Sequence, residues 1–178
     1  MGGILGGYIT YLLDKKKERE FKMLKQKKKS FIKFIYMTHN PSNVPDCFYR
    51  ISVKALILDD KKRFLLTLEN KGLWELPGGG LHFGEKPLEG LTREIKEEMG
   101  LETIHINEQP SYFLTTPHKS GQWWICNIVY ETKVKNLNFK PSDECVELRF
   151  FTKEEALKEH IFSNVLEFIK IYNPNNHQ

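Results

Sequence analysis

The sequence predicts an α/β protein in which a mixed β-sheet carries helices on both faces. Short apolar or alternating runs, typical of strands, are interleaved with segments whose apolar residues recur every three or four positions, as in helices. Short polar turns separate some neighbouring strands and a helical segment separates others, so one chain contains both hairpins and crossover connections. No internal repeat is visible.

Seven segments have the residue pattern of strands. Residues 48–58 alternate and then become continuously apolar, as in a core strand, and residues 59–62 supply a turn to a predicted hairpin partner at 63–68. The other predicted strands are 73–76, 102–107, 111–116, 122–133 and 146–151. Two late helices are predicted at 153–159 and 161–172, the second with apolar residues available for a core face: Phe162, Val165, Leu166, Ile169 and Ile171.

Residues 87–99 are predicted to form the central helix. Pro87 suits a first helical position, where its missing N–H would have no partner, and Gly100 stands where helices commonly end in a left-handed residue. Lys86 is a weak N-cap. The helix would bury one stripe, made of Leu88, Leu91, Ile95 and Met99.

The same helix carries an acidic face. Glu94, Glu97 and Glu98 lie on adjacent turns, where like charges repel by a few tenths of a kcal/mol for each pair, so stability alone does not favour them. A divalent metal ion would neutralise them, because Mg²⁺ prefers oxygen ligands and binds one or two carboxylates together with water and substrate phosphate. Just before the helix, residues 77–80 (PGGG) let the backbone approach a ligand closely.

These residues resemble the Nudix box of the Nudix hydrolase family without a mismatch. The positions that match are Gly79, Glu85, Arg93, Glu94, Ile95, Glu97, Glu98, Gly100 and Leu101. The resemblance implies an α/β/α sandwich over residues 47–172, and hydrolysis of a nucleoside diphosphate linked to another group with Mg²⁺ or Mn²⁺ as cofactor. It makes Glu94, Glu97 and Glu98 catalytic metal ligands together with the Gly78 carbonyl, and Gly79, Glu85 and Gly100 structural positions of the box.

Arg93 is expected to pair with Glu85 or Glu97 and so lock the loop to the helix. The general base is left open between Glu94 in the box and two carboxylates outside it, Glu144 and Glu147. Aromatic residues that could stack a nucleobase are Trp74, Phe113 and Trp124, with Tyr112 and Trp123 as further candidates.

Outside this domain we predict an apolar and then lysine-rich extension with helical pattern (residues 1–38), a linker (39–46) and a C-terminal tail (173–178). Residues 1–35 hold 10 Lys and Arg against 3 Asp and Glu, a net charge of +7, whereas the other residues hold 17 against 20. The apolar start, residues 1–13, is too short to span a bilayer. The extension has the pattern of a solvated helix or of a segment that binds an anionic membrane surface, and nucleic-acid binding is the least favoured reading.

The three cysteines form no pair at metal or disulfide spacing. Cys126 and Cys145 stand in strand-like contexts typical of buried, inert thiols, which fits a cytoplasmic protein.

The leading functional hypothesis is hydrolysis of a pyrophosphate bond in a nucleoside triphosphate or a related nucleoside diphosphate derivative, by attack of water at phosphorus. The alternatives are an ADP-ribose or nucleotide-sugar pyrophosphatase and a domain that senses a nucleotide without cleaving it. The sequence does not decide between a monomer and a homodimer.

Overall fold

A computed structural model describes residues 48–121, 123–142 and 144–177, together with the helical residues Lys15, Lys17, Lys22 and Met23. Residues 48–178 form one unit, which is the subject of this description. The predictions for the basic extension, for the linker and for Cys47 lie outside the described residues. In the part of the chain that is described, no helix is long and apolar enough to cross a membrane.

The larger sheet is built on its longest strand, β6 (Trp124–Val134). β1 (Tyr49–Leu56) runs parallel to β6, with Tyr49 opposite Trp124 and Leu56 opposite Glu131. β5 (Tyr112–Pro117) and β4 (Thr103–Ile106) pair antiparallel with β6. The sheet therefore combines parallel and antiparallel pairs, which confirms the predicted mixed sheet.

A smaller antiparallel sheet holds the remaining strands in the order β3-β2-β7. These are β3 (Trp74–Glu75), β2 (Phe64–Leu68) and β7 (Glu147–Phe151). The predicted hairpin between residues 48–58 and 63–68 is present only at its closed end, where Leu58 and Phe64 form an antiparallel bridge and Leu65 N–H donates to the Ile57 carbonyl at 2.9 Å. Beyond this end, β2 pairs with β3 and β7 and not with β1.

The glycine-rich loop occupies the edge of β1 that does not pair with β6, which explains why β2 pairs elsewhere. The N–H groups of Val53 and Ala55 donate to the carbonyls of Gly79 and Pro77, at 2.9 and 2.8 Å. Leu81 N–H donates in turn to the Ile51 carbonyl at 3.2 Å. The glycine-rich loop thus occupies the edge that a hairpin partner would need, and the same hydrogen bonds fix that loop against the sheet.

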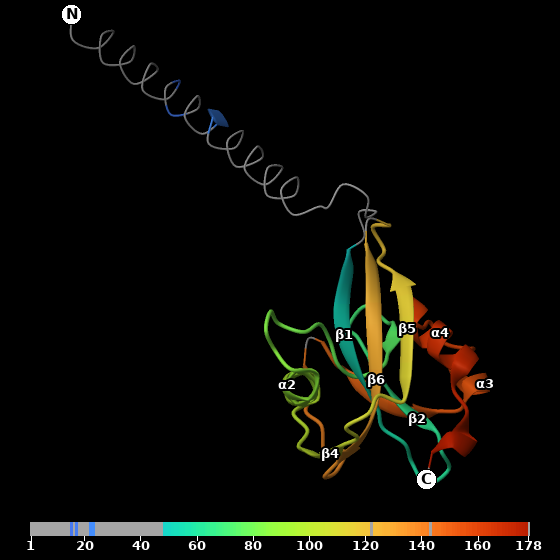
Figure 1. Ribbon diagram of the computed structural model, residues 1–178. Helices are drawn as coiled ribbons and strands as arrows, with labels where there is room; N and C mark the ends of the chain where they lie inside the picture. The colour runs from blue at the N-terminus through green and yellow to red at the C-terminus, as the bar shows by residue number, and fades with distance from the viewer. Residues whose placement is uncertain are drawn as a thin grey trace, which may run out of the picture. The chain divides into compact units, whose positions relative to one another are not determined.

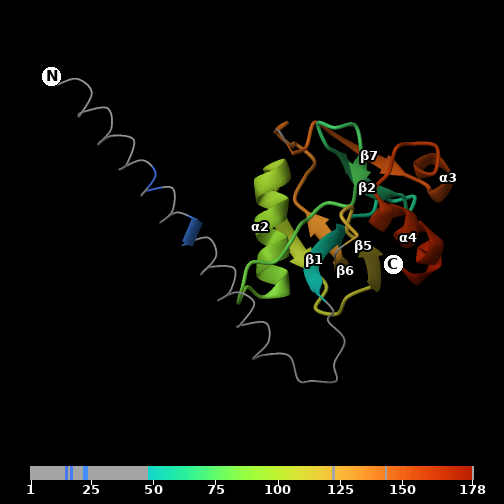
Figure 2. The same cartoon turned by 90° about the horizontal axis from the view of Figure 1, so that it is seen from above.

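Helices cover both faces, which confirms the α/β/α architecture (Figures 1 and 2). α2 (Pro87–Met99) lies on one side of β1, and α3 (Lys153–Ala156) and α4 (Ser163–Ile171) lie on the other. Each helix layer has its own apolar core, one containing Val53, Leu91 and Ile95 and the other containing Leu56 and Phe168.

α2 begins and ends as its sequence predicts. Pro87 is its first residue, and Gly100 closes it in the left-handed conformation, φ 66°, with its N–H bonded to the Lys96 carbonyl. Lys86 contributes no side-chain cap. Of the predicted stripe, Leu91, Ile95 and Met99 are fully buried and Leu88 is half-buried.

The C-terminal part of the domain differs from the prediction in the buried face of α4 and in the packing of the tail. α4 buries Val165 and Ile169 as expected, but Leu166 and Ile171 are exposed. The segment predicted as a tail packs on the domain: His177 is buried, with its Nδ1 2.7 Å from Glu131 Oε2 and its Nε2 2.8 Å from the Tyr112 hydroxyl. The domain therefore continues to His177.

Candidate active site

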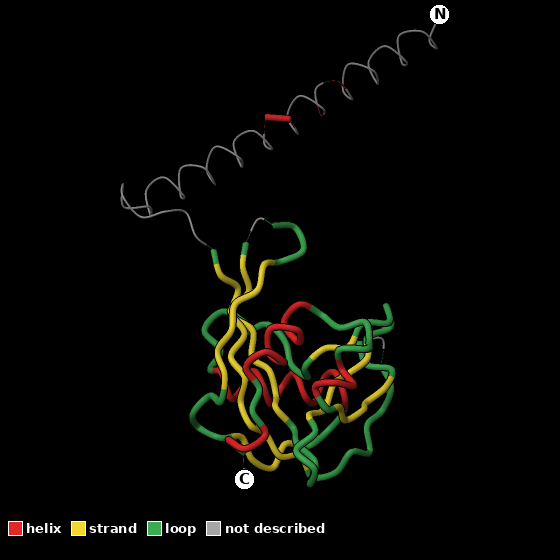
Figure 3. The backbone as a smooth tube through the Cα atoms, turned by 90° about the vertical axis from the view of Figure 1, so that its right-hand side faces the viewer, coloured by secondary structure: helices red, strands yellow, loops and turns green. Residues whose placement is uncertain are grey.

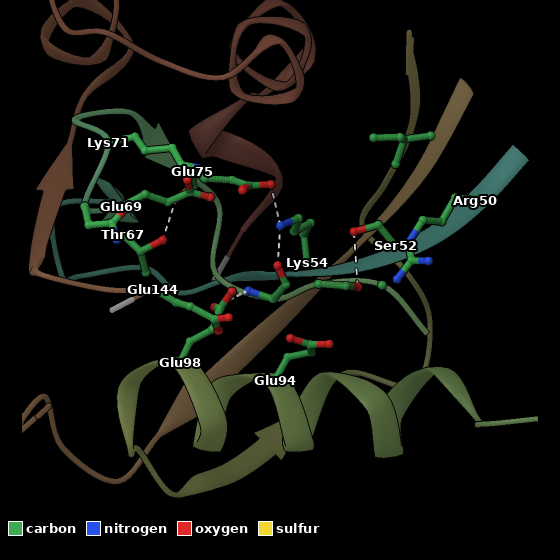
Figure 4. A pocket seen from close by; sticks show the side chains of 15 residues that line it. Arg50, Ser52, Lys54, Thr67, Glu69, Lys71, Glu75, Glu94, Glu98 and Glu144 are labelled. Carbon is green, nitrogen blue, oxygen red and sulfur yellow. Dashed lines mark hydrogen bonds and ion pairs between the residues drawn. The ribbon is translucent and has the colours of Figure 1, made fainter. Parts of the chain in front are cut away.

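A cavity of about 550 Å³ opens along the edge of β1, above the acidic face of α2 (Figure 4). Its lining contains five carboxylates and three cationic side chains, and Ile125 is its one large apolar residue. The glycine loop lines the cavity with its backbone. The other described lining residues come from β1, the β2–β3 region, α2, β6 and the segment before β7, namely Arg50, Ser52, Lys54, Thr67, Glu69, Asn70, Lys71, Glu75, Glu94, Glu98, Ile125 and Glu144.

The glycine loop can run along this cavity only because it lacks side chains. Gly78 has φ 111°, and a Cβ there would lie 2.4 Å from the Val53 carbonyl oxygen. A Cβ on Gly79 would lie 2.6 Å from a carboxylate oxygen of Glu94. The first contact would strain the backbone and the second would displace an acidic side chain, so both glycines are required by close approach.

Glu98 lies beneath this loop, and its Oε2 accepts a hydrogen bond of 2.9 Å from Gly78 N–H. Burial raises the pKa of the Glu98 carboxyl to about 7, although the nearby Lys54 charge and the Gly78 N–H act in the opposite direction. The carboxylate is therefore short of positive charge, a condition that a bound cation would relieve.

Lys54 is a site residue that the sequence reasoning missed. Its side chain is 4% exposed, its Nζ lies 2.5 Å from Glu75 Oε1, and it donates to the Gly78 carbonyl. Asn164 on α4 donates to the same Glu75 oxygen at 2.9 Å. The signal was a lysine among the buried residues of β1, between Val53 and Ala55, because an isolated charge is rarely buried without a specific partner.

Arg93 joins α2 to the loop, as predicted. Its Nε and Nη2 donate to both oxygens of Glu85, at 2.8 and 2.9 Å, and its Nη1 donates to Glu94 and Glu97 at 2.8 and 2.9 Å. The Arg93 hydrogen bonds, with a further one from His82 N–H, lower the pKa of Glu85 to about 2. The pairing with Glu85 and with Glu97 is confirmed, and it is bidentate toward Glu85.

The predicted metal ligands are only partly brought together. Glu94, Glu98 and the Gly78 residue line the cavity, whereas Glu97 is more exposed, is held by Arg93 and does not line it. Within the described ranges, no three acidic, histidine or cysteine side chains converge closely enough to hold a metal ion by themselves. Two carboxylates and one carbonyl beside an open polar cavity fit Mg²⁺, which completes its coordination with water and substrate phosphate.

The two carboxylates proposed outside the box occupy different places. Glu144 lines the cavity opposite α2, and its N–H is bonded to the Ser142 hydroxyl at 3.2 Å. Glu147 begins β7, does not line the cavity and lies 3.8 Å from Arg149 Nε. The structure thus brings Glu144, and not Glu147, to the acidic face of α2.

None of the predicted stacking residues lines the cavity. Trp74 is 3% exposed and packs edge-to-face on Phe151 in the core, so its assignment to base stacking is wrong. Phe113 and Trp124 are exposed, but the strand alternation places them on the opposite face of the sheet from Ser52 and Ile125. The ends of β1, β5 and β6 extend past the helices (Figure 3). Trp124 begins β6 opposite Pro117, whereas Phe113 pairs with Ile128 further along the sheet.

The two described cysteines are buried and free, as predicted. Burial raises the pKa of both thiols, that of Cys145 to about 11. Neither thiol therefore has the character of a nucleophile at neutral pH.

Comparison with known proteins places this architecture in a family. The model of the NUDIX domain matches residues 48–169. An RNA pyrophosphohydrolase of Ruthia magnifica subsp. Calyptogena magnifica is 45% identical over 60 residues, which are 33% of this chain and 34% of that relative. A MutT-like protein of Streptomyces ambofaciens is 27% identical over 68% of this chain and 76% of its own length.

An ADP-ribose pyrophosphatase of Methanocaldococcus jannaschii is 32% identical over 57% of this chain and 60% of its own length. Among solved structures, a MutT protein from Methanosarcina mazei Go1 superimposes with a TM-score of 0.63 and 25% identity, covering 76% of this chain and 100% of that one. The extent of the family match, together with the cavity built from the Nudix box, shows that the chain belongs to the NUDIX family of hydrolases.

Proposed function

We propose that this protein hydrolyses a pyrophosphate bond in a nucleoside triphosphate or a related nucleoside diphosphate derivative, with Mg²⁺ or Mn²⁺ as cofactor. The observation that carries the proposal is the carboxylate of Glu98, which is short of positive charge beneath a backbone loop that borders a polar cavity. A bound divalent ion would neutralise phosphoryl oxygens and lower the pKa of water.

Glu94, Glu98 and the Gly78 carbonyl are the residues that we assign to metal binding, with Glu97 as a further ligand if its side chain leaves Arg93. Arg93 has a positioning role, because its guanidinium donates to carboxylates of the Nudix box and to the Gly80 carbonyl of the loop. It holds Glu85, and through it the loop, at a fixed height above α2.

Glu144 is our candidate for the general base outside the box. Its side chain lies beside that of Glu98 at the cavity (Figure 4), which gives it access to a water molecule beside a bound phosphate. The other candidate, Glu94, has one oxygen held by Arg93 at 2.8 Å, and we assign its carboxylate to metal binding.

The cavity lining supports a substrate recognised chiefly through its phosphates. Arg50, Lys54 and Lys71 supply positive charge, and no aromatic side chain is among the described lining residues. This composition favours a phosphate-rich substrate over one held by base stacking in this cavity, so we rank nucleoside triphosphates above ADP-ribose.

The test is product analysis of the purified protein with Mg²⁺. The panel holds nucleoside triphosphates, oxidised dGTP, RNA with a 5′-triphosphate, ADP-ribose, NADH and dinucleoside polyphosphates. We expect cleavage of a triphosphate that is lost in Glu98→Gln and retained in Glu89→Gln, which removes an exposed charge from the same helix. Nucleotide binding without cleavage of any panel member would favour the alternative, a domain that senses nucleotides.

A further inference from the structure

Lys54 is a buried lysine that lines the cavity. It is neither a metal ligand nor a general base, so the proposed function assigns it no role. Two groups hold its ammonium: the carboxylate of Glu75 at 2.5 Å and the carbonyl of Gly78. Figure 4 shows the Lys54 ammonium between these two groups. Asn164 donates to the same Glu75 oxygen from the opposite helix layer, so the ammonium has little freedom to leave. The Lys54 ammonium is therefore held against one backbone oxygen of the glycine loop, the Gly78 carbonyl.

The Gly78 carbonyl is also the backbone ligand that we assign to the metal ion. An ammonium and a divalent cation that share one oxygen repel each other. At a separation of about 4 Å this repulsion, even with the dielectric constant of water, changes an affinity by more than about tenfold.

We propose that Lys54 is an internal counter-cation that competes with the metal ion for the Gly78 carbonyl and lowers the affinity of the site for the free ion. The inference rests on the proposed function and adds a condition to it. A nucleotide brings phosphate oxygens whose negative charge offsets the repulsion between the ammonium and the ion, so the site loads the ion together with nucleotide in preference to the ion alone. Arg50 and Lys71, which also line the cavity, strengthen that preference.

The test is titration calorimetry of Mn²⁺ binding at pH 8 by the full chain and by Lys54→Met, which keeps the length of the side chain and removes the charge. We expect Lys54→Met to bind Mn²⁺ about tenfold more tightly than the wild type. Lys158→Met, which removes an exposed charge outside the cavity lining, is expected to stay within about twofold. Adding a non-hydrolysable nucleotide analogue should narrow the difference between Lys54→Met and the wild type.

The sign of the effect separates this role from a structural one. If Lys54 only held the loop in place, Lys54→Met would bind Mn²⁺ more weakly, and that result would overturn the proposal. If the wild type binds Mn²⁺ measurably and folded Lys54→Met binds it with the same affinity, the role proposed for Lys54 is overturned and the proposed metal site is not. Absence of binding in both proteins overturns the proposed metal site as well.

A second measurement on the wild-type protein covers the case in which Lys54→Met does not fold. In protein labelled with ¹⁵N-lysine, the ammonium resonance of Lys54 should shift when Mg²⁺ is added, and no other buried lysine lines the cavity in the described structure. A Lys54 resonance that stays unchanged at saturating Mg²⁺ would overturn the proposal.

Discussion

Two cations hold the loop between Gly78 and Glu85, and the two ends of the loop are balanced differently. At the Glu85 end, Arg93 pairs with three carboxylates, and the pKa of Glu85 falls to about 2. At the Gly78 end, Lys54 contacts the Glu75 carboxylate and the Gly78 carbonyl, while burial raises the pKa of the neighbouring Glu98 to about 7.

The difference separates a structural lock from a reactive site. Where a fixed guanidinium matches the carboxylates around it, the ion pairs are satisfied and hold the loop in place. Where a carboxylate is buried with too little positive charge, folding leaves a group that gains stability when a cation binds. The four predictions that follow test this contrast, from the largest expected effect to the smallest.

The largest effect is expected from Glu98→Gln. Removing the charge that is short of a partner should lower kcat/KM by on the order of a thousandfold, because transition-state stabilisation by the bound ion is lost. Glu97→Gln, whose side chain is held by Arg93 outside the cavity, should cost about tenfold. Steady-state kinetics with the substrate found in the panel measures both. Equal losses in the two variants would contradict the distinction between the two ends.

Glu144→Gln is expected to lower kcat by about a hundredfold with little change in KM, as loss of a general base does. The matched variant is Glu147→Gln, whose carboxylate is exposed and outside the cavity lining, and it should stay within about twofold. A larger loss for Glu147→Gln than for Glu144→Gln would show that the base lies elsewhere.

Arg93→Met removes the cation at the Glu85 end of the loop. It leaves Glu85, Glu94 and Glu97 without their shared cation, so the loop loses its anchor on α2. We expect the midpoint of thermal unfolding to fall by about 5 °C, with kcat/KM reduced by about tenfold because the loop is displaced. A loss of activity at unchanged stability would instead assign Arg93 to direct substrate contact.

The smallest effect is on stability as a function of pH without metal. With EDTA present, folded protein holds a proton on Glu98 between its ordinary pKa of 4.5 and about 7, whereas unfolded protein releases it, so this group makes the free energy of unfolding rise as the pH falls through that range. Glu85 acts in the opposite sense: its stabilising contribution is present above pH 4.5 and is lost as the pH falls toward 2.

Urea unfolding of the wild type and of Glu98→Gln in EDTA measures this linkage. The variant lacks the penalty of burying a charge, so it should be more stable than the wild type above pH 7, by about 3 kcal/mol at most. The difference should become small near pH 4.5 and vanish below it, where the wild-type carboxyl is protonated in both states. A difference that is independent of pH would contradict the shifted pKa of Glu98.

The sequence by itself determined α2, its caps and the chemistry of its two faces. Proline at the first helical position, glycine at the left-handed end and apolar residues three or four apart are local signals, and each acts within a few residues of where it is written. The same local character explains why the strand segments and the Arg93 partners were predicted, since the box fixes those partners at short range along one helix and the adjoining loop.

Only the tertiary structure decided which strands pair and which charges meet. The edge of β1 could pair with either β2 or the glycine loop. The loop occupies it, through hydrogen bonds between residues far apart in the sequence. Lys54 and Glu75 come together for the same reason, on strands of different sheets. Periodicity reports which side of a strand is apolar, but pairing and long-range contacts depend on how whole elements pack.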